Sequence, residues 1–280
     1  MGRNLDGVIQ AMLSLITSIH NPRVKNAVKL RSGRDRTRQG RILIDGLREI
    51  QRAQQAGVQF SEVFACLPTD DDHGQRWIES IEAAGIDVFR VAPNVFTRLA
   101  YGQLAHGAVA VATPPCHTLD QLSWTGDALV IVLEGVEKPG NVGAVVRSAD
   151  AAGASAVVVA DGATDLYNPN AIRASLGTIF AVPVCAASSR ETLDWLRRRR
   201  LRIFTARVDA AVPYTQISYR EPAAIVLGSE AQGLSDTWQG ADMTAVSLPM
   251  RGSADSLNVS TTAAVVLYEA LRQRTAGAAG

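Results

Sequence analysis

The chain has 280 residues, of which 47 % are hydrophobic and 20 % are charged, and its formal net charge is +1. This composition is typical of a globular protein and excludes intrinsic disorder and fibrous structure, while the length allows two domains. Three well-separated cysteines and four histidines predict neither a disulfide framework nor a zinc site, and therefore a protein of the reducing cytoplasm.

The apolar segments of the chain are short. The run at residues 8–19 resembles the core of a signal peptide, but Asp6 precedes it and no small-residue cleavage site follows. We therefore do not predict a signal peptide. No segment approaches the ~18 uninterrupted apolar residues of a membrane span, so we expect no membrane segment.

Positive charge is concentrated between residues 20 and 52, which carry ten arginines and lysines against three acidic residues. This segment has a net charge of +7, and the rest of the chain −6. Clustered cations form the electrostatic footprint of a phosphate-binding surface, so the segment predicts contact with nucleic acid. The alternative is a solvated face in a chain where arginine outnumbers lysine 25 to 3. The candidate contacts are Arg23, Lys25, Lys29, Arg31, Arg34, Arg36, Arg38 and Arg41.

The first half of the chain alternates predicted strands and helices. After an N-terminal extension (1–16) we expect a compact α/β domain over 17–112 and a proline-containing linker at 113–127. The predicted strands are 41–46, 60–66, 86–92 and 107–114, and the predicted helices are 47–57, 73–85 and 93–100.

The second half begins with a continuous apolar strand at 128–135, of the kind that is covered on both faces. Further strands are predicted at 155–162, 181–186, 201–207, 223–230 and 244–249, and helices at 141–154, 169–177, 190–200 and from 256 onward. This alternation indicates a mostly parallel α/β sheet over 128–274, followed by a tail at 275–280. Four arginines at 197–200 indicate either a second basic patch or a helix C-terminus, which favours cations.

Three loops after predicted strands hold glycines and polar residues, and ligands of parallel sheets bind beyond the carboxyl ends of strands. In the first loop Asn141 and Gly143 open a helix, and Arg147 lies one turn beyond Gly143 on the same face. The glycine admits a ligand or another backbone there, and the alternative is a plain turn with a surface arginine. In the second loop Gly228 ends a strand and permits contact with a flat ligand. Glu230 follows, and its carboxylate requires either a cation, for which Arg147 is the candidate, or a capping role.

The third loop opens the last helix with more polar side chains than a cap needs, since Ser256 or Asp255 alone would suffice. The dinucleotide fingerprint, the P-loop and the hydrolase nucleophile elbow are all absent from the sequence. The three loops therefore stand as the candidate site.

In chain order the loops read N-x-G-x-x-x-R (141–147), G-S-E-x-x-G-L (228–234) and P-M-x-G-x-x-x-S-L-N-V-S (249–260). This ordered set resembles the three signature motifs of the SpoU/TrmH family, the RNA ribose 2′-O-methyltransferases of the SPOUT superfamily, and the resemblance covers residues 129–274. The N-terminal half is similar to the L30e-like RNA-binding domain of family members that act on ribosomal RNA. The two-domain layout resembles that of antibiotic-resistance members acting on 23S rRNA, the avilamycin type in particular.

The resemblance implies a deep trefoil knot in the C-terminal domain, S-adenosylmethionine as the cofactor, and a homodimer whose active sites use residues of both chains. It also implies 23S rRNA as the substrate, a cytoplasmic location and no metal. The positions that match the family's cofactor contacts are Ala206, Gly228, Leu248, Met250 and Leu257. The positions that match its catalytic polar residues are Asn141, Arg147, Glu230, Ser256 and Asn258.

A ribose 2′-oxygen that attacks a sulfonium methyl group must also lose its proton. Because a guanidinium is effectively always protonated, we expect Arg147 to hold the target phosphate and stabilise the developing alkoxide, with Glu230 and Asn141 positioning it. The alternatives are a tRNA 2′-O-methyltransferase, a non-enzymatic ribosomal-RNA-binding protein, which would not need three polar loops, and a nicotinamide oxidoreductase, whose fingerprint is missing.

Overall fold

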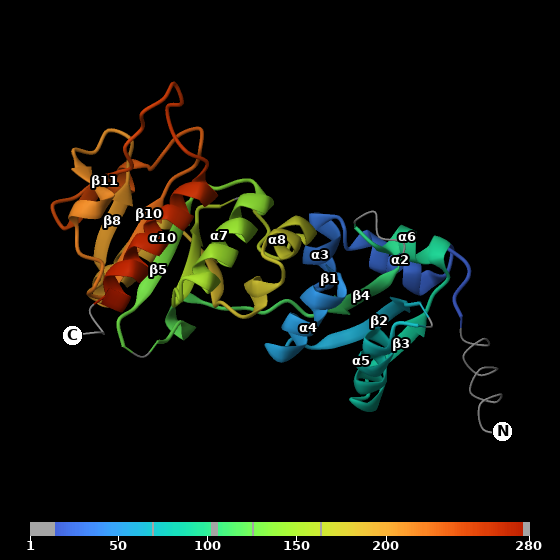
Figure 1. Cartoon of the computed structure of the whole chain (residues 1–280). Coiled ribbons are helices and arrows are strands. Elements are labelled where there is room, and N and C mark those ends of the chain that lie inside the picture. Colours follow the sequence, from blue (N-terminus) through green and yellow to red (C-terminus); the bar gives the residue numbers. More distant parts are fainter. Residues whose placement is uncertain (1–14, 69, 102–105, 125, 163, 277–280) are drawn as a thin grey trace. The chain divides into compact units, whose positions relative to one another are not determined.

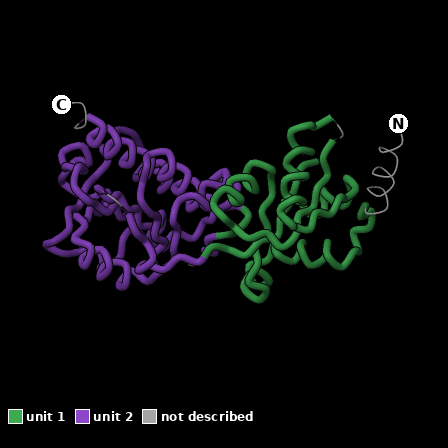
Figure 2. Tube along the Cα trace, turned by 90° about the horizontal axis from the view of Figure 1, so that it is seen from below, with its two compact units in different colours: residues 1–115, 167–169 green, residues 116–166, 170–280 purple. Residues whose placement is uncertain are grey.

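The computed structural model describes residues 15–68, 70–101, 106–124, 126–162 and 164–276. The chain divides into two compact units, one of residues 1–115 with 167–169 and one of residues 116–166 with 170–280 (Figure 2). Most of the expected N-terminal extension and most of the tail lie outside the described residues. Within the described ranges, no helix is both long and apolar enough to cross a membrane.

The N-terminal unit contains a four-stranded mixed sheet in the order β1-β4-β2-β3 (Figure 1). Strand β4 is antiparallel to both β1 and β2, whereas β3 is parallel to β2. The strands are β1 (Ile42–Asp45), β2 (Phe60–Cys66), β3 (Asp87–Arg90) and β4 (Gly107–Ala112), and the helices between them are α4 (Leu47–Gln55), α5 (Asp72–Ala83) and α6 (Pro93–Leu99). Every strand and helix predicted for this domain is present.

Two short helices that the sequence patterns do not predict carry much of the basic segment: α2 (Pro22–Lys29) and α3 (Gly33–Gln39). Asn21 caps α2, because its side chain accepts a hydrogen bond of 2.9 Å from the backbone N–H of Arg23. Val24 and Ala27 are buried, so α2 packs on its apolar face and exposes its cations on the other.

Arg36, on α3, corrects the set of predicted RNA contacts. Its side chain is only 4 % exposed, and its Nη1 donates to the carbonyl oxygens of Leu30 at 2.7 Å and Arg31 at 2.9 Å. Because the guanidinium satisfies backbone carbonyls inside the unit, it cannot reach a phosphate. The prediction was therefore wrong for Arg36, which stabilises the turn between α2 and α3.

The C-terminal unit contains a seven-stranded parallel sheet in the order β7-β6-β5-β10-β8-β11-β9 (Figure 1). Its strands are β5 (Leu129–Glu134), β6 (Ala156–Ala160), β7 (Val184–Ala187), β8 (Arg202–Ala206), β9 (Val212–Pro213), β10 (Ala223–Leu227) and β11 (Met243–Ser247). Its α-helices are α7 (Pro139–Ala151), α8 (Pro169–Ala174), α9 (Ser189–Arg198) and α10 (Val259–Ala276). The two-residue strand β9 is the only one of these strands that the sequence does not predict.

The centre of this sheet explains the apolar runs of the sequence. Every residue of β5, β6 and β10 is buried, because β5 lies between β6 and β10 and helices cover both faces. Helices α7 and α10 lie side by side (Figure 1), and Ala263 and Leu267 of α10 are fully buried. Since all strands are parallel, the loops after β5, β8, β10 and β11 leave from the same edge.

The second part of the expected linker belongs to the C-terminal unit. Leu122 is buried in the core of that unit, and Trp124 contacts Trp195 edge-to-face with ring centroids 5.5 Å apart. The Arg199 guanidinium lies over both indole rings and donates to the carbonyl of Leu122 at 3.2 Å. In the run of four arginines, Arg199 thus fastens this segment to α9, which supports a structural role for that residue.

Candidate active site

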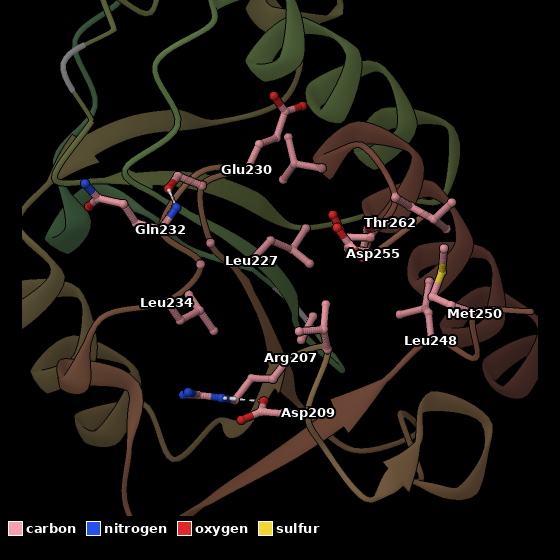
Figure 3. A pocket seen from close by; sticks show the side chains of 18 residues that line it. Arg207, Asp209, Leu227, Glu230, Gln232, Leu234, Leu248, Met250, Asp255 and Thr262 are labelled. Atoms are coloured by element: carbon pink, nitrogen blue, oxygen red, sulfur yellow. Dashed lines mark hydrogen bonds and ion pairs between the residues drawn. The ribbon is translucent and has the colours of Figure 1, made fainter. Parts of the chain in front are cut away.

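A cavity of about 460 Å³ lies at the carboxyl edge of the parallel sheet (Figure 3). The loops after β8, β10 and β11 and the first turn of α10 form its walls. The structure brings together here all five residues predicted to contact the cofactor: Ala206, Gly228, Leu248, Met250 and Leu257. Its volume falls within the ~300–1,000 Å³ that is usual for small-molecule sites.

The loop after β10 is tightly folded, and Gly228 makes this fold possible. A Cβ atom on Gly228 would lie 2.3 Å from the carbonyl carbon of Gly233 and 2.5 Å from the backbone nitrogen of Leu234. Gly233 itself has φ +66° and donates its N–H to the carbonyl of Ser229 at 3.0 Å. The absence of a side chain at Gly228 therefore lets Gly233 and Leu234 of the same loop pack against it. The sequence suggested only that Gly228 contacts a ligand, whereas the structure shows that it also shapes the loop.

The last helix begins at Val259 and is capped by Asn258, which corrects the prediction of Ser256 or Asp255 as the cap. The Oδ1 atom of Asn258 accepts hydrogen bonds from the backbone N–H of Ser260 at 2.9 Å and from its hydroxyl at 2.6 Å. Ser256 and Asp255 precede the helix as exposed residues and line the cavity.

Glu230 is the centre of a polar network that joins three loops. Its Oε1 accepts hydrogen bonds from Asn141 Nδ2 at 3.0 Å and from Asn258 Nδ2, and its Oε2 accepts from Lys138 Nζ at 2.8 Å. Asn258 Nδ2 also lies 3.4 Å from Asn141 Oδ1. Three of the five predicted catalytic residues are thus in direct contact, one from each motif.

The cation that pairs with Glu230 is Lys138, whereas the sequence suggests Arg147. The hydrogen bond from the ammonium group lowers the pKa of Glu230, and the same bond raises the pKa of Lys138. Arg147 is exposed and lines neither this cavity nor the second one described below. A separation of six helical residues from Asn141 corresponds to a rotation of about 240° and a rise of about 9 Å, so α7 directs the two side chains to different sides.

Gly143, between these two residues, allows a close approach of backbone. A Cβ atom there would lie 2.3 Å from the carbonyl oxygen of Ala171 and 2.8 Å from the Cβ of Ala174. Of the two possibilities left open by the sequence, a ligand or another backbone, the structure shows the backbone of α8.

A second cavity, of about 540 Å³, adjoins the first and shares part of its wall. Residues lining both cavities are Ser229, Glu230, Gln232, Gly233 and Val259. In Figure 3 the carboxylate of Glu230 points away from the apolar side chains of Leu227 and Leu248. Its hydrogen-bond partners Lys138 and Asn141 accordingly line the second cavity and not the first.

The ionisable groups of the second cavity have distinct surroundings. Glu134 is 6 % exposed and accepts hydrogen bonds of 2.7 Å from the hydroxyls of Ser189 and Ser235 and from the backbone N–H of Ser235. Asp161 accepts from the backbone N–H of Ser189 at 3.0 Å. These two carboxylates fasten the loops of the sheet edge, whereas Glu230 faces both cavities.

The two cavities offer complementary chemistry. The first has apolar walls, with Leu227, Leu234 and Val259 beside the predicted residues. Of its carboxylates, Asp209 pairs with Arg207, which leaves Glu230 and Asp255 in excess. This cavity therefore suits a ligand that is largely flat and apolar and carries a positive charge. The described residues include no cluster of histidine, cysteine or acidic side chains suited to a metal ion.

Several residues of the site are not predicted from the sequence. Lys138 and Gln232 belong to no recognised position of the motifs, although both line a cavity. The available signal for Lys138 is compositional, since the chain has only three lysines against 25 arginines.

The predicted RNA contacts of the N-terminal unit fall into two groups. Lys25, Lys29, Arg34 and Arg41 are exposed, as the prediction requires.

The other predicted contacts have partners within the unit. Arg23 pairs with Glu62 at 3.3 Å and lies over the ring of Phe89, and Arg38 pairs with Asp35. Arg31 donates to the carbonyl of Ala100. Arg23 and Arg38 nevertheless expose more than half of their side chains.

Comparison with known proteins follows the division into two units. Residues 128–268 match the model of the SpoU rRNA Methylase family, and residues 21–110 match that of the MRM3-like substrate binding domain. The 23S rRNA (uridine(2479)-2′-O)-methyltransferase of Streptomyces viridochromogenes is 33 % identical over 86 % of this chain and 86 % of its own. The 23S rRNA (guanosine(2553)-2′-O)-methyltransferase of Bacillus subtilis is 28 % identical over 90 % of this chain and 97 % of its own.

Solved structures show the same relationship. The crystal structure of an RNA 2′-O ribose methyltransferase superposes with a TM-score of 0.80 at 42 % identity, covering 93 % of this chain and 99 % of that one. The SpoU methyltransferase AviRb from Streptomyces viridochromogenes, in complex with the cofactor AdoMet, superposes with a TM-score of 0.79 at 30 % identity, covering 91 % of this chain and 99 % of that one. The motifs, the two-unit fold and these similarities agree, and the chain belongs to the SpoU rRNA methylase family.

Proposed function

We propose that this protein transfers the methyl group of S-adenosylmethionine to the 2′-hydroxyl of a ribose in 23S rRNA. The single observation that carries the proposal is the convergence of all three motifs on two adjoining cavities at the carboxyl edge of the sheet. One cavity offers the residues for the cofactor, and the network of Glu230, Asn141 and Asn258 lies at the boundary with the other.

The first cavity fits the cofactor in size and in charge. Leu227, Leu248 and Leu257 provide apolar walls for the adenine ring, and the tight loop after Gly228 presents backbone groups. The cofactor supplies a methyl group on a positively charged sulfonium, and the carboxylate of Asp255, which lines this cavity, balances this charge. Binding here is the basis for alignment of the methyl group with the incoming ribose, which contributes most to a displacement of this kind.

The second cavity is proposed as the site of the target nucleotide. The 2′-oxygen would form a bond to the methyl carbon while the bond from carbon to sulfur breaks with its electron pair staying on sulfur, and the hydroxyl proton would pass to solvent water. Glu230 is poorly suited to accept the hydroxyl proton, because the hydrogen bond from Lys138 lowers its pKa and its oxygens already accept hydrogen bonds from Lys138, Asn141 and Asn258. Its role is to orient the two amides at the boundary of the cavities.

We further propose a homodimer in which each active site receives Arg147 from the partner copy. This accounts for the position of Arg147 on a different side of α7 from Asn141, outside both cavities of its own chain. In that role it holds the phosphate of the target nucleotide and stabilises the developing alkoxide, as a permanently charged guanidinium can. A knotted course of the loops at 228–234 and 248–258 is part of the same proposal.

The MRM3-like domain, with its exposed cations, is proposed to bind the RNA around the target. The relatives named above act on 23S rRNA at different nucleotides, uridine in one and guanosine in the other. The nucleotide modified by this protein is therefore to be mapped directly.

The test is methyl transfer from isotope-labelled S-adenosylmethionine to isolated 23S, 16S and transfer RNA. Nuclease digestion followed by mass spectrometry of nucleosides identifies a 2′-O-methylnucleoside, and primer extension at low nucleotide concentration locates it. We expect label in 23S rRNA alone. Label on a base, in transfer RNA, or in no RNA while the cofactor binds would each refute part of the proposal.

A further inference from the structure

Lys138 stands at the active site without a role in the motifs. It immediately precedes α7 as its N-cap residue, its side chain is 73 % exposed, and its ammonium lies 2.8 Å from Oε2 of Glu230. It lines the second cavity, at the side where Asn141 contacts the same carboxylate.

Two observations indicate that Lys138 serves Glu230 and not its own helix. A cation at a helix N-terminus opposes the helix dipole, and the side chain of Lys138 makes no capping hydrogen bond to α7. In addition, lysine is rare in this chain: Lys25 and Lys29 lie in the N-terminal unit, and after residue 29 the sequence has 23 arginines and a single lysine, Lys138. An ammonium is a compact point charge, and it is not interchangeable with a planar guanidinium.

The contacts of Glu230 divide between its two oxygens. Oε2 accepts from the ammonium of Lys138, and Oε1 accepts from the amides of Asn141 and Asn258. The ionised carboxylate accepts all three hydrogen bonds most strongly, because hydrogen bonds to a charged acceptor are stronger and a proton on either oxygen would occupy a lone pair beside one of these donors. The cation therefore fixes the state in which Glu230 can clamp both amides.

The other charged groups around Glu230 are mainly negative, so Lys138 is the cation that stabilises its ionised form. Glu134, Glu137 and Asp161 line the second cavity, in which Lys138 is the one cation among the described residues. In the first cavity the carboxylates of Asp209 and Asp255 are present, and the cation Arg207 pairs with Asp209 at 3.4 Å. Without Lys138, Glu230 would face mainly negative neighbours, which disfavour its ionised form.

We propose that Lys138 is a positioning residue for methyl transfer: its ammonium holds the Glu230 carboxylate so that this carboxylate clamps Asn141 and Asn258 at the boundary of the two cavities. The inference rests on the proposed function. It differs from a direct contact of Lys138 with RNA phosphate, in which the lysine would contribute to RNA affinity independently of Glu230.

The pH dependence follows from the direction of the shift. The pKa of Glu230 is lowered by the hydrogen bond from Lys138, so the clamp is formed above that pKa and is lost as the pH falls through it. Removal of the ammonium raises the pKa, and the clamp is then lost at a higher pH than in the wild-type protein.

The experiment compares Lys138→Met, Lys138→Arg, Glu230→Gln and the double variant Lys138→Met/Glu230→Gln in single-turnover methyl transfer. Arg190→Met is the matched control, because Arg190 is equally exposed and pairs with an acidic residue, Asp194, away from both cavities. We expect Lys138→Met to lower the rate of transfer about 10- to 100-fold with little change in the affinity for RNA. Lys138→Arg retains part of the rate, the acidic limb of the pH profile moves to higher pH in Lys138→Met, and the control behaves as wild type.

The double variant distinguishes the two roles. If Lys138 acts through Glu230, Lys138→Met has little further effect in the Glu230→Gln background. Additive losses, a weaker RNA affinity with a reduced salt dependence, or an unchanged rate would each overturn the proposal.

A second measurement does not depend on methylation. Titration of ¹³C-labelled glutamate side chains by NMR, with the Glu230 signal assigned from its absence in Glu230→Gln, reports the protonation of that carboxyl. We expect a shift to higher pH in Lys138→Met, and no shift would refute the clamp. Should the wild-type protein methylate no RNA, the proposed function fails, whereas this titration still decides the role of Lys138.

Discussion

Asn258 makes two different contacts at once: its Nδ2 donates to Oε1 of Glu230, and its Oδ1 accepts the backbone N–H of Ser260 at 2.9 Å. The start of α10 and the network between the cavities are therefore joined by one side chain. A displacement of the Asn258 side chain would therefore break both the cap of α10 and the contact with Glu230.

Substitution Asn258→Ser separates these two contacts. Serine caps a helix about as well as asparagine but is too short to donate to Glu230, so we expect the free energy of unfolding to change by less than ~0.5 kcal/mol. The rate of methyl transfer falls at least about tenfold, because the amide donor is lost. Chemical denaturation and single-turnover assays measure the two effects, and Asn258→Ala should show both losses. A fully active Asn258→Ser would mean that Asn258 is only a cap.

Substitution Gly228→Ala tests whether the loop after β10, which lines the first cavity, binds the cofactor. The new Cβ would lie 2.3 Å from backbone atoms of Gly233, so the loop must move, and we expect the affinity for S-adenosylmethionine to fall at least about tenfold. Gly140→Ala is the matched control, since a Cβ there meets nothing within 4 Å. Isothermal titration calorimetry measures both, and equal affinities of the two variants would contradict a role for the loop in cofactor binding.

Mixed dimers test the proposed contribution of Arg147 from the partner copy. Arg147→Ala and Glu230→Gln should each keep only a small but measurable fraction of the wild-type rate alone, whereas a random mixture of refolded subunits should recover about a quarter of the wild-type rate, because half of the dimers contain one intact site. Size-exclusion chromatography with light scattering establishes the dimer first. If the mixture stays at the low rate of the single variants while the dimers exchange subunits, both residues act within one chain.

The exposed cations of the N-terminal unit should determine the salt dependence of RNA binding. Lys25→Gln and Arg34→Gln should each weaken binding and lower the slope of log affinity against log salt concentration by about 0.7 to 0.9. Arg36→Gln should instead lower the melting temperature, because the carbonyls of Leu30 and Arg31 lose their donor. Filter binding at several salt concentrations measures the slopes. Unchanged slopes for both variants would show that α2 and α3 are not part of the RNA-binding surface.

Arg274 should be the most stabilising cation of α10. It donates to the carbonyls of Asp127 at 2.6 Å, Ala128 at 2.9 Å, Tyr219 at 2.8 Å and Glu221 at 3.1 Å. We expect Arg274→Met to cost about 2–4 kcal/mol in the free energy of unfolding, since several carbonyls lose a charged donor. Arg190→Met is the control and should change stability little, because Arg190 forms an exposed pair with Asp194. Denaturation curves with similar midpoints for both variants would contradict this account.

The sequence predicts the elements well where apolar runs are bounded by turns, and the five residues that the motifs propose for the cofactor line one cavity. It fails where a contact depends on the direction of a side chain. Arg147 and Asn141 are close in sequence, but the helix rotates one away from the other, and Glu230 pairs with Lys138 instead. The burial of Arg36 likewise depends on a turn whose carbonyls need a donor, which no charge pattern reveals.

The loop at 229–233 forms the wall of both cavities, and this has a thermodynamic consequence. A ligand that shifts the loop in one cavity changes the affinity of the other cavity for its own ligand. By thermodynamic linkage, the ligand of the other cavity changes the affinity for the first ligand by the same factor. We therefore expect the affinity for the cofactor to depend on bound RNA, and the affinity for RNA to depend on bound cofactor, through the backbone of this loop. Methyl transfer removes the positive charge of the sulfonium, and we expect this change in the first cavity to alter the affinity for the methylated RNA in the second.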